Sequence, residues 1–180
     1  MVANREASRM TGGNVQSSWR KRLWRYGPLV VWLAFIFFAS TGALSAPNTS
    51  RIIGPLLRWL FPNITEAQLL RAHFLTRKLA HFSEYAVLAL LAARAFIPST
   101  HRWLRRRWLT SALVLVAVYA LLDEYHQTFV PSRTGSIWDS MIDIAGGVTA
   151  LVVLALWRVR SLMLKQAEKD SLPQTPRTQR

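Results

Sequence analysis

The sequence has 180 residues, enough for one domain or a small helical bundle with tails. It is 51% hydrophobic and 18% charged, and its long apolar blocks exclude an ordinary small soluble domain. The formal net charge is +14, but the basic residues flank apolar runs and no base-reading motif accompanies them, which argues against nucleic-acid binding. The absence of cysteine excludes disulfides and thiol catalysis.

The N-terminal part of the chain predicts a tail followed by a membrane span. Residues 1–19 are polar and irregular, and we expect them to be disordered. The apolar run at 28–45 is about long enough to cross a bilayer. Its end, Ala43-Leu44-Ser45, also resembles a signal-peptide cleavage site. The run is longer and richer in Trp and Phe than a typical signal sequence, so we predict a retained first helix.

Residues 46–65 contain three prolines and mix apolar residues with Arg51 and Arg58. This segment is too short to span and predicts an interfacial element, lying on the membrane surface. Thr65 and Gln68 have the spacing of a capping box, which predicts the start of a long helix there. The second half of that helix, near 79–97, is the second predicted span.

The remaining apolar runs predict a third span near 108–125 and a fourth near 138–157, joined by a short connection. Residues 161–180 are polar and predict a second disordered tail. The predicted fold is therefore an all-α membrane protein. Four transmembrane helices form a bundle within residues 20–160, and an interfacial segment lies between the first and second.

The distribution of Lys and Arg predicts the orientation of the bundle. Six lie in the N-terminal tail, four in the 98–108 loop and six in the C-terminal tail. The other side has six, but five of them are spread across the long 46–78 segment. The positive-inside rule then predicts a multi-pass membrane protein with both termini cytoplasmic.

With that topology, three helices bring polar faces to the outer leaflet. Arg77, His81 and Glu84 share one face of the second span, and Asp139 and Asp143 share one face of the fourth. Charged groups at membrane depth are costly and usually functional. We therefore predict one polar site near the outer surface, built from Arg77, Lys78, His81, Glu84, Tyr85, Asp123, Glu124, Gln127, Arg133, Asp139 and Asp143.

Three motifs carry a family resemblance: R-K-x-x-H-F-x-E-Y at 77–85, D-E-x-x-Q-x-F-x-P-x-R at 123–133 and D-x-x-x-D-x-x-G at 139–146. In this order they resemble the VanZ-like family, bacterial membrane proteins named for a teicoplanin-resistance determinant. The resemblance covers roughly residues 28–157, and it implies that the protein lies in the bacterial inner (plasma) membrane. It implies a role at the cell envelope, in lowering sensitivity to glycopeptide or lipoglycopeptide antibiotics. One departure is Asp143, where many relatives carry Asn.

The residues themselves allow a binding function. The basic side chains would bind phosphate or carboxylate, and the acids and amide would bind hydroxyls, amides or amines. The partners would be membrane lipids, a lipid-linked cell-wall intermediate or a lipoglycopeptide. The candidate binding residues are Arg77, Lys78, Tyr85, Gln127, Arg133 and Asp143.

Two further interpretations stay open. In a hydrolase or transferase, His81 and Glu84 would act with Asp123, Glu124 and Asp139 as acids and bases; no cofactor is required, although His81, Glu84 and Asp139 could ligate a divalent metal. In a purely structural interpretation, the charges join helices and Gly146 and Gly147 allow close packing or dimerisation, which leaves the oligomeric state open. Five acids beside a few bases exceed what packing needs.

Overall fold

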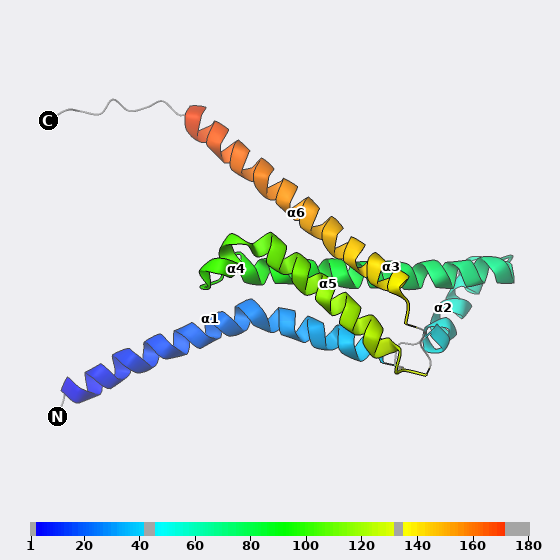
Figure 1. Cartoon of the computed structure of the whole chain (residues 1–180), viewed down its shortest axis with the longest axis horizontal. Helices are drawn as coiled ribbons and strands as arrows, with labels where there is room; N and C mark the ends of the chain where they lie inside the picture. Colours follow the sequence, from blue (N-terminus) through cyan, green and yellow to red (C-terminus); the bar gives the residue numbers. More distant parts are fainter. Residues whose placement is uncertain (1–2, 42–45, 132–134, 172–180) are drawn as a thin grey trace.

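The computed structural model describes residues 3–41, 46–131 and 135–171, and within them the side chains of residues 19–41, 51, 53–131 and 135–171. Helices account for nearly all of these residues (Figure 1). They are α1 (Ala3–Ser40), α2 (Ala46–Leu60), α3 (Glu66–Phe96), α4 (Arg102–Arg106), α5 (Trp108–Gln127) and α6 (Ile137–Ser171).

Four of the described helices, α1, α3, α5 and α6, are long and apolar enough to cross a membrane. This confirms the predicted all-α fold with four membrane-spanning helices. The third span is predicted most closely, because α5 covers 108–127 against an expected 108–125. Of the first predicted span, residues 28–40 lie within α1, and residues 42–45 lie outside the described residues.

Two segments predicted as irregular tails are helical over much of their length. α1 begins at Ala3, and α6 continues to Ser171. Residues 158–171 contain no proline, so a helix formed in the fourth apolar run can propagate into them. α1 continues through Pro28, which lies inside the helix. Hydropathy predicts where a span ends but not where its helix ends. Residues 172–180 and the possible cleavage site at Ala43–Ser45 lie outside the described residues.

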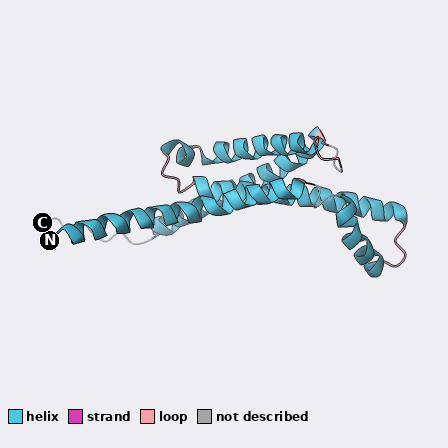
Figure 2. Cartoon of the chain, turned by 90° about the horizontal axis from the view of Figure 1, so that it is seen from below, coloured by secondary structure: helices cyan, strands magenta, loops and turns pink. Residues whose placement is uncertain are grey.

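α2 and α3 form a corner at one end of the molecule. The backbone N–H of Gln68 donates to Thr65 Oγ1 at 3.3 Å, and the Thr65 N–H donates to Gln68 Oε1 at 2.9 Å, which is the capping box that the sequence predicts. An exposed ion pair of 3.0 Å joins Arg58 at the end of α2 to Glu66 at the start of α3. Figure 2 shows this end of α3 reaching past the other long helices, with α2 inclined to it.

α3 is the central helix, and it packs against α6, α5 and α1. Its inner face carries four alanines that are fully buried: Ala89, Ala92, Ala93 and Ala95. Small side chains let helix backbones approach closely where lipid offers no hydrophobic drive for association. The facing core residues are Leu29 and Ile36 of α1, Ala112, Val116 and Ala120 of α5, and Leu151 of α6.

Hydrogen bonds attach α1 to α3, to α5 and to the connection before α4. The Trp32 indole N–H donates to the Glu84 carbonyl at 2.9 Å, and the Tyr119 hydroxyl donates to the Leu33 carbonyl at 2.5 Å. Toward α4, the hydroxyls of Tyr26 and Ser99 lie 2.9 Å apart. These bonds satisfy polar side chains within apolar surroundings, where they would otherwise be costly.

The connections divide between the two ends of the bundle (Figure 1). The start of α1, the short α4 and the end of α6 lie at one end. The α2 corner and the connection between α5 and α6 lie at the other. This pairing of loops agrees with the four spans that the apolar runs predict. We call the α2 end the corner end.

Candidate functional site

The α3 contribution to the site begins at Arg77, about three turns after the start of the helix at Glu66. Arg77 and Lys78 are half-buried, and His81 follows with 8% of its surface exposed. Tyr85, one turn further, is fully buried. Glu84 is half-buried, and its charge interacts with His81. α3 thus presents two cations, an imidazole and a phenol along one side.

Carboxylates of α6 face these groups. The Lys78 ammonium forms an ion pair with Asp139. One turn further, Asp143 Oδ1 lies 3.3 Å from Nδ1 of His81, close enough for an ion pair but not aligned as a hydrogen bond. The sequence alone paired His81 with Glu84 on its own helix; the structure adds Asp143 from another helix.

Two glycines set the position of α6. A Cβ at Gly146 would collide with the backbone of Phe82, so α6 and α3 are nearly in backbone contact there. A Cβ at Gly147 would lie 2.6 Å from a methyl carbon of Val116 on α5. Because these contacts lie one turn beyond Asp143, they hold both α6 carboxylates against α3.

α5 adds two carboxylates and an amide from its last turn. The Gln127 side-chain N–H donates to Asp123 Oδ2 at 3.0 Å. Glu124 Oε2 accepts a hydrogen bond of 2.6 Å from the backbone N–H of Ser136, just before α6 begins. That bond ties the end of α5 to the start of α6, and therefore fixes one oxygen of Glu124.

These groups form one cluster. The Glu124 charge interacts with those of Asp139, Asp143 and His81, and the Asp143 charge also interacts with that of Asp123. All are at most 8% exposed apart from the more open Lys78. We call the following set the polar cluster: Lys78, His81, Asp123, Glu124, Gln127, Asp139 and Asp143.

Several buried polar atoms of the site lack a hydrogen-bond partner among the described residues. Four are oxygens that can accept: Glu124 Oε1, Gln127 Oε1 and both oxygens of Asp143. The Tyr85 hydroxyl, Arg77 Nε and His81 Nδ1 are also without a hydrogen-bond partner within those residues. Buried polar groups are normally satisfied, so such a concentration in one place marks a site rather than a packing detail.

Sequence reasoning missed the groups that tie this site together. Ser140 is 1% exposed, and its hydroxyl donates to the Ala120 carbonyl at 3.4 Å. The backbone of Ser136 holds Glu124. A serine directly after Asp139 carries no distinctive pattern, and a backbone donor carries none at all. Arg133, expected as a binding residue, lies outside the described residues.

The possible metal site is not formed. Within residues whose side chains are described, no three His, Asp or Glu side chains converge as a metal would require, and His81, Glu84 and Asp139 are no exception. His126, which the sequence left without a role, contacts the Phe37 ring with centroids 4.7 Å apart.

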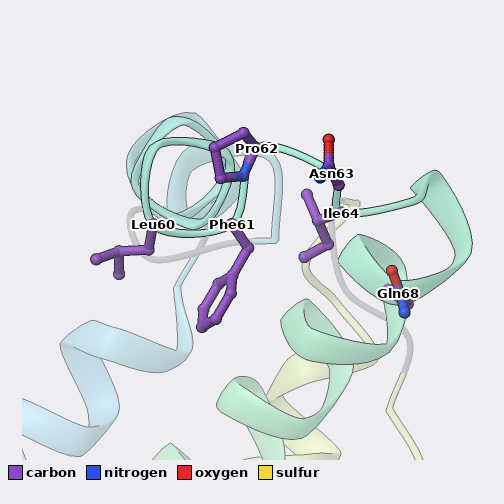
Figure 3. A pocket seen from close by; sticks show the side chains of 6 residues that line it. All are labelled: Leu60, Phe61, Pro62, Asn63, Ile64 and Gln68. Atoms are coloured by element: carbon purple, nitrogen blue, oxygen red, sulfur yellow. The ribbon is translucent and has the colours of Figure 1, made fainter.

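A separate hollow lies at the α2 corner. Its lining comes from the end of α2, the connection and the start of α3: Leu60, Phe61, Pro62, Asn63, Ile64 and Gln68 (Figure 3). It has a volume of about 510 Å³ and a mostly apolar lining. Gln68 precedes Lys78 by ten residues on α3, so the hollow lies about 15 Å along the helix axis from the polar cluster.

Comparison with known proteins places this architecture in a family. No significant match was found among curated proteins, and none among solved structures. Residues 26–158, however, match the VanZ/LLP1 family. That range includes the four apolar runs and every residue of the polar cluster, in agreement with the motif resemblance. The chain belongs to the VanZ/LLP1 family.

Proposed function

We propose that this protein binds the polar part of a lipid-linked envelope component, or of a lipoglycopeptide drug, in the polar cluster, and thereby lowers sensitivity to teicoplanin-type antibiotics. The observation that carries the proposal is the set of buried oxygens in the cluster without a partner among the described residues. A site that only joined helices would satisfy its own hydrogen bonds, because each unsatisfied buried group costs about 1–3 kcal/mol.

Mixed charge suits such a ligand. The half-buried Arg77, whose Nε has no partner among the described side chains, could bind a phosphate or carboxylate oxygen. The oxygens of Glu124, Gln127 and Asp143 could accept from hydroxyls or amines. The apolar hollow beside α2 would lie near the acyl chain of a lipid held at the membrane surface.

The proposed orientation puts this site on the outer side of the plasma membrane, with both termini in the cytoplasm. Its support is the excess of Lys and Arg at the end of the bundle opposite the corner end. We expect a cysteine at the exposed Asn63 to react with an impermeant thiol reagent in intact cells, and one at the exposed Thr100 to react only after permeabilisation. The reverse labelling would invert the topology.

The decisive experiment removes the charge pair without leaving a lone charge. The double variant Lys78→Met with Asp139→Leu should accumulate normally but lose its effect on teicoplanin sensitivity in an expressing bacterium. The matched control replaces the exposed pair with Arg58→Gln and Glu66→Gln, and should retain the effect. If the double variant Lys78→Met with Asp139→Leu keeps its full effect on teicoplanin sensitivity, the ion pair of Lys78 and Asp139 has only a structural role.

A second candidate function is hydrolysis or group transfer on a lipid-linked envelope substrate. The observation that favours it is the approach of Asp143 to His81, since a carboxylate beside an imidazole orients it as a general base. Incubation of the purified protein with lipid-linked wall precursor or lipoglycopeptide, followed by mass spectrometry, separates the candidates. Unchanged but retained ligand supports binding, and chemical turnover supports the enzyme.

A further inference from the structure

We infer that the polar cluster selects a ligand bearing a protonated primary amine. This inference rests on the proposed binding function and names the chemistry of the group that enters the site. The observation that carries it is a set of buried oxygens without a partner among the described residues, on Glu124 and Gln127 of α5 and on Asp143 of α6. The charges of Glu124 and Asp143 are close enough to interact.

The first step is the hydrogen-bond inventory. The four oxygens without a partner among described residues belong to side chains that are 0% to 6% exposed, so water reaches them poorly. The buried donor groups without a hydrogen-bond partner among the described residues of the same region are the Tyr85 hydroxyl, Arg77 Nε and His81 Nδ1, and His81 Nδ1 already lies 3.3 Å from Asp143 Oδ1. Each carboxylate or amide oxygen can accept two hydrogen bonds, so three such donors cannot satisfy four oxygens. A ligand that completes this site must therefore bring several hydrogens to donate.

The second step is the charge balance. Within the polar cluster, four carboxylates stand against one permanent cation, Lys78, with the half-buried Arg77 beside it on α3. The four carboxylates are those of Asp123, Glu124, Asp139 and Asp143. Lys78 is committed to Asp139, and His81 is the ion-pair partner of Asp143. A buried excess of negative charge favours a cationic ligand, because an unpaired buried charge is strongly unfavourable.

The third step distinguishes kinds of cation. A primary ammonium carries three N–H donors, as a lysine side chain does, and can serve oxygens of Asp143 and Glu124 at once. A quaternary ammonium has no N–H and would leave the oxygens unsatisfied. A divalent metal would need three converging ligands, which the described side chains do not supply. An anionic headgroup alone would meet the carboxylates as like charges.

The depth of the cluster suits a headgroup. Asp143 lies six residues into α6, about 9 Å from the start of the helix, and Glu124 is within the last turn of α5. The amine could belong to a phospholipid or to a soluble molecule. The shared chemistry is the protonated primary amine, and the experiment separates the two sources.

The test compares lipids that differ only in the headgroup. The purified full chain in detergent is titrated with dioleoyl phosphatidylethanolamine, phosphatidylcholine or phosphatidylglycerol, and bound lipid is measured by native mass spectrometry. We expect phosphatidylethanolamine to bind about tenfold more tightly than the other two, as the loss of one charge-assisted hydrogen bond would predict. Displacement by soluble phosphoethanolamine would identify a free amine as sufficient; its failure to compete would identify the lipid as the source.

Two variants make the test specific. Asp143→Asn should abolish the preference for phosphatidylethanolamine, because it removes the negative charge at nearly constant shape. The control Asp170→Asn makes the same chemical change on an exposed part of α6 and should keep the preference. Equal retention of the three lipids, or an unchanged preference in Asp143→Asn, would overturn the inference.

The failures of the inference and of the proposed function differ. The unmodified protein could retain the three lipids equally, while the double variant Lys78→Met with Asp139→Leu retains none of them. That result would support a headgroup-binding site but contradict its selection of an amine. If the double variant retains every lipid as well as the unmodified protein does, both the amine selection and the proposed binding function are contradicted.

Discussion

The two halves of the α3–α5–α6 bundle are built in different ways. Toward α4, the interface is made of small apolar residues, and Ala92 of α3 and Ala112 of α5 are both fully buried. Toward the corner end, the same three helices meet through the polar cluster, in which Asp143 and Gln127 are also fully buried. One half is held by close packing and the other contains buried charge.

This difference bears on the purpose of the charges. The half near α4 demonstrates that these helices can associate through alanine, valine and leucine contacts, which need no desolvation of ions. Burying an ion costs several kcal/mol, and a well-packed apolar replacement is often neutral or more stable. The polar half therefore retains charge at a cost that packing does not require, which supports a functional role for it.

The largest expected effect comes from Gly146, at the boundary of the two halves. Gly146→Ala places a Cβ against the Phe82 backbone, which cannot move aside as a side chain could. We expect a loss of more than about 3 kcal/mol in the free energy of unfolding, seen as a lower melting temperature and poor accumulation. The control Gly27→Ala, whose Cβ would meet only Leu23 at 3.8 Å, should be neutral. A stable Gly146→Ala protein would contradict this close approach.

The next effect separates single from paired charge removal in the polar half. Asp139→Asn leaves the Lys78 ammonium without its partner, and we expect a loss of about 2–3 kcal/mol, discounted because Lys78 is 20% exposed. The double variant Lys78→Met with Asp139→Leu should regain most of this stability. Thermal unfolding of the purified proteins measures both. A double variant as unstable as the single one would give the pair a structural role.

A smaller effect is expected in the apolar half. Ala92→Leu adds three carbons at a fully buried position on α3, so we expect a loss of about 1–3 kcal/mol from overpacking. Leu90→Ala, at an exposed position on the same helix, serves as the comparison. Unlike Lys78→Met with Asp139→Leu, Ala92→Leu should leave ligand binding intact in the molecules that remain folded. If Ala92→Leu loses ligand binding without losing stability, packing in the apolar half affects the ligand site in the polar half.

The sequence predicted the fold better than the pairing of the polar side chains. Apolar run lengths predicted four spans, and i, i+4 spacing placed Asp139 and Asp143 on one face of α6. Which cation meets which carboxylate depends on the register of α6 against α3. That register follows from the contact of Gly146 with Phe82, a tertiary fact with no local pattern. The pairing of His81 with Asp143 could not be read for the same reason.

Hydropathy also did not predict where the helices end. Apolar content predicts the part of α6 within a bilayer, but the helix continues to Ser171 because its polar residues are good helix formers. The α2 corner was better specified, since Thr65 and Gln68 form the expected capping box. Local hydrogen-bonding signals thus predicted a boundary where composition could not.

The smallest expected effect concerns Tyr85, where the two halves meet on α3. Its ring is fully buried, and its hydroxyl has no partner among the described residues, so Tyr85→Phe should change the free energy of unfolding by less than about 1 kcal/mol. If the hydroxyl contacts a ligand in the polar cluster, the same variant should weaken lipid retention several-fold at unchanged stability. Val116→Ala, a buried change on the opposite helix, is the control: it should lower stability and leave retention alone. If Tyr85→Phe retains lipid as well as the unmodified protein does, the Tyr85 hydroxyl does not contact the ligand and the residue contributes only to packing.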